Sequence, residues 1–173
     1  MVAMVARVTI GKKKYIEVEK RMHEIIEIAE SMRLQLTKAV VEDSASFEGY
    51  IEALRLPKNN DEELALRNDA MEKAILHAAE VPHRVAGLAM TVLHLAQELV
   101  AIGNLNAISD AASSAHLAIA AARIAGLNVM TNRNSLKIPS MADQMVLDIE
   151  NYRLQILQIE QEIAQSLRER ANL

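Results

Sequence analysis

The chain lacks cysteine and tryptophan and has little proline, glycine or aromatic side chain. Its 173 residues include one Phe, three Tyr, three Pro and five Gly. The absence of cysteine excludes disulfide bonds, thiolate metal sites and cysteine nucleophiles, and it is typical of a cytoplasmic protein. Because turn-forming Gly and Pro are sparse, an all-β fold built from many short strands has little support.

Excess basic charge and long apolar runs are also missing. The formal net charge is −4 with mixed signs, so no basic field predicts binding to nucleic acid. The apolar opening MVAMVARV is interrupted by Arg7, well short of the roughly 20 apolar residues that a spanning helix needs. Its Lys-rich stretch follows the apolar run, whereas a signal peptide carries positive charge before it. We therefore expect no nucleic-acid partner, no membrane partner and a cytoplasmic location.

Aliphatic residues are abundant and regularly spaced. Hydrophobic residues make up 51% of the chain and aromatic residues 2%, so the core must be built from Ala, Leu, Ile, Val and Met. These residues recur at alternating steps of three and four, which is typical of left-handed helix bundles. We expect an all-α fold, a bundle of about five long helices with coiled-coil-like packing, in a single domain over residues 1–173.

Helix start and stop signals divide the chain. Gly11 and Pro57 should end two helices, and Gly103 should end a third, which Pro82 kinks without stopping. Asp143 offers a capping box for the last helix, and Asn59, Asn60 and Asp61 are candidate N-caps for the third. The expected helices cover about residues 1–9, 14–55, 61–102 and 109–128, with a last one beginning at 139.

One carboxylate interrupts the apolar stripe of the second helix. An ionised carboxylate in an apolar seam is costly unless paired, and burial raises the pKa of a carboxyl group towards neutrality. Asp43 is therefore a candidate general acid/base, with Phe47 and Tyr50 as an apolar wall. The alternative is a tolerated polar residue that fixes helix register. The stripe consists of Val18, Met22, Ile25, Ala29, Met32, Leu36, Ala39, Asp43, Phe47, Tyr50 and Leu54.

Two further segments are dense in polar side chains. The segment GNLNAISD, residues 103–110, gathers two amides, a hydroxyl and a carboxylate, more than helix capping requires. In LNVMTNRNS, residues 127–135, Asn128 and Asn132 fall on one helical face. Amide pairs of this kind can read the donor and acceptor edges of a heterocycle.

Histidine and lysine residues provide weaker signals. Five histidines raise the possibility of a metal site, but Glu-x-x-His spacing occurs only from Glu80 to His83, with Pro82 inside it. We expect no metal site. The run Lys12–Lys14 is typical of a solvated loop, although lysines at a helix start also favour an anionic ligand nearby.

A set of motifs resembles a known family. DSASFEGY, LRLPKN with a nearby Arg67, AAEVP, GNLNAISDAA and LNVMTN occur in that order. They resemble the cyclodeaminase domain of formiminotransferase-cyclodeaminase, a family that includes stand-alone methenyltetrahydrofolate cyclohydrolases. The likeness runs from about Met1 to Ser140. It implies a dimeric, all-α, folate-binding enzyme of one-carbon metabolism and histidine degradation, which either closes formiminotetrahydrofolate with loss of ammonia or opens the methenyl ring with water.

The resemblance also implies roles for individual residues. The proposed acid/base carboxylate of the family matches Asp43, and a tetrahydrofolate derivative is the substrate, with no cofactor. Lys12–Lys14 would meet the glutamate tail of the folate. Asp43, Asn104, Asp110, Asn128 and Asn132 are expected to converge on one cleft. The candidate substrate-binding residues are Phe47, Asn104, Asn106, Ser109, Asp110, Asn128, Asn132 and Lys14.

Two departures from the family pattern affect the expected activity. The family carries an upstream Pro-Gly-Gly-Gly-Ser loop, and this sequence begins in mid-pattern after it. Thr131 and Arg133 stand where the family places aliphatic residues around the Asn that matches Asn132. We therefore expect an incompletely walled site with weak folate binding and a homodimer that covers apolar helix faces. The alternative is a non-catalytic helical interaction protein, a degenerate or truncated family member.

Overall fold

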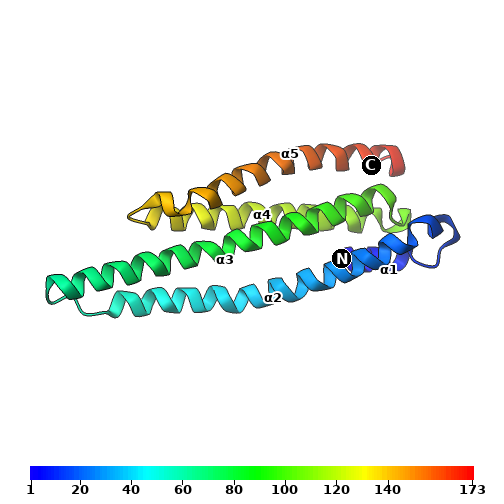
Figure 1. The fold of residues 1–173 in the computed structure, drawn as a ribbon. Helices are drawn as coiled ribbons and strands as arrows, with labels where there is room; N and C mark the ends of the chain where they lie inside the picture. The colour runs from blue at the N-terminus through cyan, green and yellow to red at the C-terminus, as the bar shows by residue number, and fades with distance from the viewer.

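The computed structural model describes residues 1–173 and contains helices but no strands. The expected all-α bundle of five helices is confirmed, and the four long helices lie roughly alongside one another, with α1 packed near one end (Figure 1). Short 3₁₀ segments η1 (Lys13–Val18), η2 (Leu105–Ala107) and η3 (Pro139–Ala142) precede α2, α4 and α5. The helices are α1 (Val2–Thr9), α2 (Glu19–Arg55), α3 (Asp61–Ile102), α4 (Ile108–Ser135) and α5 (Asp143–Ala171).

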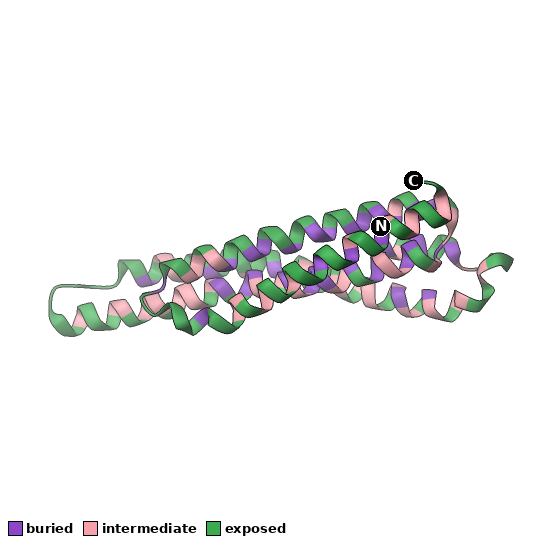
Figure 2. Cartoon of the chain, turned by 90° about the horizontal axis from the view of Figure 1, so that it is seen from above, coloured by how far each residue is buried: buried purple, intermediate pink, exposed green.

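The helix α3 is the centre of the bundle. It contacts each of the other four helices and contributes the largest share of the buried side chains. By length and composition α3 is apolar enough to cross a membrane, and half of its most apolar stretch is buried inside the bundle. In Figure 2 the buried positions face inwards between the helices and the exposed positions face outwards.

Several helix ends differ from the sequence expectation. The second helix begins at Glu19 rather than at Lys14, because Tyr15 has non-helical dihedral angles within η1. The fourth continues to Ser135, well beyond Asn128. The expected capping box of Asp143 is wrong: α5 has no side-chain N-cap, and Asp143 instead pairs with Arg133 at 3.1 Å.

The turn between α2 and α3 follows the expected capping chemistry. The Asn60 side chain accepts a hydrogen bond from the N–H of Glu63 at 2.9 Å, and the Glu63 carboxylate accepts one from the N–H of Asn59 at 2.8 Å. Arg67 Nε donates to the carbonyl of Leu54 near the end of α2 at 3.1 Å. These bonds satisfy groups that both helix ends leave unpaired.

The outer half of α2 packs through small residues rather than through its large apolar ones. Ala39, Ser46 and Ala53 are buried at intervals of seven, whereas Phe47 is 64% exposed. Small side chains let α2 approach α3 closely, and the stripe that contains Asp43 then lies to one side of the contact. The expectation that Asp43 is buried in a seam is therefore wrong: its side chain is exposed in this chain.

Candidate functional site

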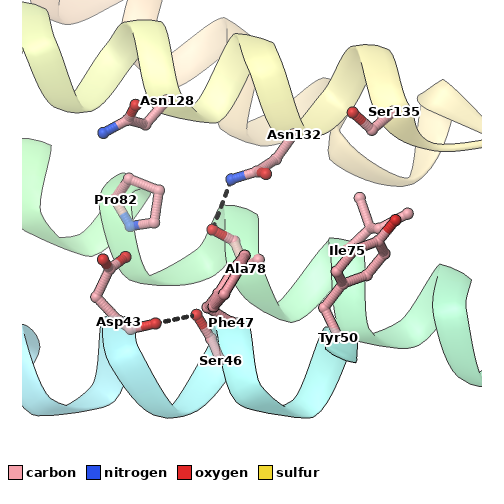
Figure 3. A pocket seen from close by; sticks show the side chains of 10 residues that line it. All are labelled: Asp43, Ser46, Phe47, Tyr50, Ile75, Ala78, Pro82, Asn128, Asn132 and Ser135. Carbon is pink, nitrogen blue, oxygen red and sulfur yellow. Dashed lines mark hydrogen bonds between the residues drawn. The ribbon is translucent and has the colours of Figure 1, made fainter. Parts of the chain in front are cut away.

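A cleft of about 370 Å³ lies between α2, α3 and α4, at the end of the bundle away from α1. Its volume falls within the range of small-molecule sites. Polar and apolar groups line it together, which suits a ligand with a flat ring and hydrogen-bonding edges. Its lining residues, drawn in Figure 3, are Asp43, Ser46, Phe47, Tyr50, Ile75, Ala78, Pro82, Asn128, Asn132 and Ser135.

The carboxylate of Asp43 extends from α2 into the space between α2 and α4 (Figure 3). Only its backbone carbonyl is engaged by a neighbouring side chain, accepting from Ser46 Oγ at 2.8 Å. Because the carboxylate belongs to none of the ion pairs of the chain, both of its oxygens are free for a ligand.

The two amides of α4 face the same cleft, as their spacing predicts. Asn128 is exposed and Asn132 is half-buried. The Nδ2 of Asn132 donates to the carbonyl oxygen of Ala78 on α3 at 2.8 Å. The cleft therefore presents a carboxylate on one wall and two amides on the other, with α3 as its floor.

Apolar side chains complete the cleft. Phe47 and Tyr50 extend from α2, as the stripe predicts, and Ile75 and Pro82 come from α3. Sequence reasoning did not select Ser46, Ile75, Ala78, Pro82 or Ser135. Ser135 could have been predicted from the sequence, since it follows Asn128 by seven residues and so shares its helical face.

The polar segment of residues 103–110 lies at the opposite end of the bundle. Along α4, Asp110 is 18 residues from Asn128, or roughly 27 Å at 1.5 Å per residue. The expected convergence of Asp43, Asn104, Asp110, Asn128 and Asn132 is therefore wrong within one chain. Only Asp43, Asn128 and Asn132 share the cleft, while Asn106, Ser109 and Lys14 lie with Asn104 near the α3–α4 turn.

The contacts of Asn104 join the start of the chain to this turn. Its Nδ2 donates to the carbonyl of Val8 at 2.7 Å, and its Oδ1 accepts from the N–H of Asn106 at 3.0 Å. Its own N–H donates to Thr9 Oγ1 at 2.9 Å. Both side-chain hydrogen-bonding groups of Asn104 thus serve the fold. Lys14 lies nearby, with its ammonium nitrogen 5.6 Å from the ring centroid of Tyr15.

Several of the remaining ionisable groups form ion pairs. No three His, Asp or Glu side chains gather at metal-binding distance. His83 lies 2.9 Å from Asp148, between α3 and α5. Hydrogen bonds from Arg33 and Arg7 hold the pKa of Glu30 below its usual range. Hydrogen bonds to Glu98 and Glu24 raise the pKa of Arg21, so its guanidinium remains charged.

Comparisons with known proteins agree with this architecture. The model of the formiminotransferase-cyclodeaminase family matches residues 1–151. A methenyltetrahydrofolate cyclohydrolase of Methylorubrum extorquens is 34% identical over 99% of this chain and 83% of that protein. A formimidoyltransferase-cyclodeaminase of Mus musculus is 27% identical over 91% of this chain, which spans only 28% of that longer protein.

A solved structure is similar in three dimensions. The crystal structure of formiminotetrahydrofolate cyclodeaminase from Thermotoga maritima superimposes with a TM-score of 0.84 and 27% sequence identity. The match covers 97% of this chain and 80% of that one.

Proposed function

The chain belongs to the formiminotransferase-cyclodeaminase family, and from this premise we propose that it acts on a tetrahydrofolate derivative in the cleft between α2, α3 and α4. The observation that carries the proposal is the free carboxylate of Asp43 facing the amides of Asn128 and Asn132. Two reactions fit, methenyltetrahydrofolate hydrolysis and formiminotetrahydrofolate deamination. Both relatives match nearly the whole chain, and the higher identity to the cyclohydrolase, 34% against 27%, favours hydrolysis.

Both reactions need one proton carrier beside the carbon that bridges N5 and N10 of the folate. In hydrolysis, water adds to this carbon and gives a proton to the Asp43 carboxylate. Asp43 passes that proton to N5 as the bond between carbon and N5 breaks, and the hydroxyl group of the adduct loses its proton to solvent to leave a formyl group on N10. In deamination, N10 attacks the formimino carbon and loses its proton to Asp43. The formimino nitrogen takes up that proton and a second one from solvent, and its bond to carbon breaks to release ammonia and leave the methenyl cation. Acid/base help of this kind contributes typically 10²–10⁴ in rate.

We assign contacts with the folate ring only to residues that line the cleft within one chain. The ring would lie against Phe47, with Asn128 and Asn132 along its polar edge, and a bound ring would shield Asp43 from water. Because proton transfer is sufficient for either reaction, we assign no cofactor. We propose a cytoplasmic location because the composition is free of cysteine.

An assay with both folates tests this proposal. With purified protein, 5,10-methenyltetrahydrofolate should lose its methenyl absorbance faster than in buffer if the chain is a cyclohydrolase. With 5-formiminotetrahydrofolate, methenyl absorbance should rise with release of ammonia if it is a cyclodeaminase. Folded protein that accelerates neither reaction would favour the alternative of a non-catalytic helical protein.

We also propose that the chain forms a homodimer through α4. The outer face of α4 exposes Leu117, Ile124 and Leu127 by 60–68%, beside an apolar groove of about 650 Å³ between α1, α2 and α4. Exposed apolar surface of this extent is typical of an interaction site. A closed two-fold contact would cover the same face on both copies.

Sedimentation velocity at micromolar concentration should therefore report a dimer. Leu127→Glu places a charge in the proposed interface and should shift the protein to monomer. Leu154→Glu changes a similarly exposed leucine on α5 and should leave the dimer intact. A wild-type protein that sediments as a stable monomer would contradict the proposed dimer.

A further inference from the structure

Proline at position 82 leaves the carbonyl oxygen of Ala78 without its usual donor. In an α-helix the N–H of a residue bonds the carbonyl four residues earlier, and proline has no N–H. Pro82 is buried, and α3 continues through it as one helix. A partly buried carbonyl without a donor is costly, so another group must reach it.

Asn132 supplies that donor from the neighbouring helix. Its Nδ2 lies 2.8 Å from the oxygen of Ala78 (Figure 3). The two ends of an Asn amide are usually told apart only by their partners. Here the partner is a backbone carbonyl, which can only accept, so the nitrogen must face Ala78. Asn128, one turn earlier, has no such partner.

The carbonyl oxygen of Asn132 is thereby left for the cleft. Asn132 lines the cleft and is half-buried, and its Oδ1 is not among the buried atoms that lack a partner. Since no protein donor bonds it either, this oxygen is open to a ligand. We propose that Pro82, through Ala78, positions Asn132 so that its Oδ1 accepts a hydrogen bond from the amino group on the ligand ring.

This inference rests on the proposed function, which names the ligand as a tetrahydrofolate derivative. The pyrimidine edge of its ring carries an amino group and a ring N–H, both donors. A ligand that lacks the amino donor would leave the positioned oxygen of Asn132 without a partner. Sites built to hydrogen-bond a substrate group discriminate against analogues that lack it.

Thermal unfolding without ligand tests the positioning step. The proteins to compare are wild type, Pro82→Ala, Asn132→Leu and the double variant. Asn132→Leu should lower Tm in wild type because it leaves the carbonyl of Ala78 unpaired. In the Pro82→Ala background the N–H restored at position 82 bonds that carbonyl, so Asn132→Leu should change Tm much less. Additive effects of the two substitutions would overturn the positioning step.

Calorimetric titration tests the ligand-reading step. The probes are 5-formyltetrahydrofolate, which does not turn over, and its 2-desamino-2-methyl analogue. Wild type should bind the first about tenfold more tightly, and Asn132→Leu should abolish that preference. Asn134→Leu, the matched control, changes an exposed amide of α4 that does not line the cleft and should keep the preference. A preference that survives in Asn132→Leu would overturn the assignment of Asn132.

Replacement by a carboxylate provides a rescue. Asn132→Asp keeps an acceptor but cannot donate to Ala78, so alone it should lose the preference. In the Pro82→Ala background the N–H restored at position 82 bonds the carbonyl of Ala78, so position 132 no longer needs a donor. The double variant should therefore regain the preference, because either carboxylate oxygen can accept from the ligand. If wild type binds neither probe, the folate proposal and the ligand-reading step both fail, while the unfolding comparison still decides the positioning step. If wild type prefers the first probe and the rescue fails, only the present inference is overturned.

Discussion

Asp43→Asn is expected to lower kcat by about two orders of magnitude or more. The amide keeps the size and position of the carboxylate but cannot carry a proton between water or N10 and the leaving nitrogen. Because Asp43 is exposed and engages no other side chain through its carboxylate, helix content and Tm should hardly change. The affinity for 5-formyltetrahydrofolate, measured by calorimetry, should also be kept within a few-fold.

Glu48→Gln is a matched control for the loss of one negative charge on α2. Glu48 is exposed and does not line the cleft, so its replacement should leave kcat unchanged. The decisive measurement is the change in methenyl absorbance at saturating substrate. Turnover near the wild-type level in Asp43→Asn would remove the acid/base assignment while leaving the fold and family unaffected.

The bundle itself could be predicted from the sequence because aliphatic periodicity and end signals act locally. Asn60 caps α3 and Pro57 follows the end of α2, as expected. Pro82 does not stop α3, also as expected. The start of α2 was misplaced because Tyr15 bonds through its hydroxyl to the N–H of Leu105, a residue 90 positions away. Such a contact leaves no signal in the local sequence.

The burial of Asp43 could not be judged from periodicity alone. The apolar stripe and the seam of small residues share Ala39 and diverge beyond it, the seam continuing through Ser46 and Ala53, and both satisfy helical spacing. Which of them meets α3 is decided by how closely the two helices approach. The small residues of α2 form the contact with α3, and the larger side chains Phe47 and Tyr50 then line an open cleft.

The composition of the site was predicted only in part for a similar reason. The face shared by Asn128 and Asn132 follows from their spacing, and it is confirmed. The separation of Asn104 and Asp110 from Asp43 depends on where along the length of the bundle each residue lies. The order of motifs in the sequence does not give that distance. The bond between Asn132 and Ala78 links residues 54 positions apart and depends on the proline at position 82.

Gly103→Ala is expected to have the largest effect on stability among the changes outside the cleft. Gly103 ends α3 as expected, but with φ −74° it needs no left-handed conformation. The requirement is space, because a Cβ at this position would lie 2.6 Å from the carbonyl oxygen of Leu99. That oxygen also accepts the N–H of Gly103 at 2.8 Å.

The surrounding backbone cannot move away easily. Arg170 donates to the carbonyl of Gly103 at 2.8 Å and also to that of Val100, and the N–H of Asn104 is bonded to Thr9. Overpacking of this kind typically costs 1–3 kcal/mol. We expect Tm to fall by about 2–12 °C, given roughly 2–4 °C per kcal/mol for a chain of this size.

Gly49→Ala is the matched comparison, with the opposite expected sign. Gly49 lies within α2, and a Cβ there would meet nothing within 4 Å. Alanine in a helix interior is more stable than glycine by roughly 0.5–1 kcal/mol, because the unfolded chain loses freedom. Calorimetric scans of both variants at one protein concentration should therefore move Tm in opposite directions. An unchanged or raised Tm in Gly103→Ala would show that the junction of α3, α4 and α5 yields to an added methyl group, contrary to the network that holds it.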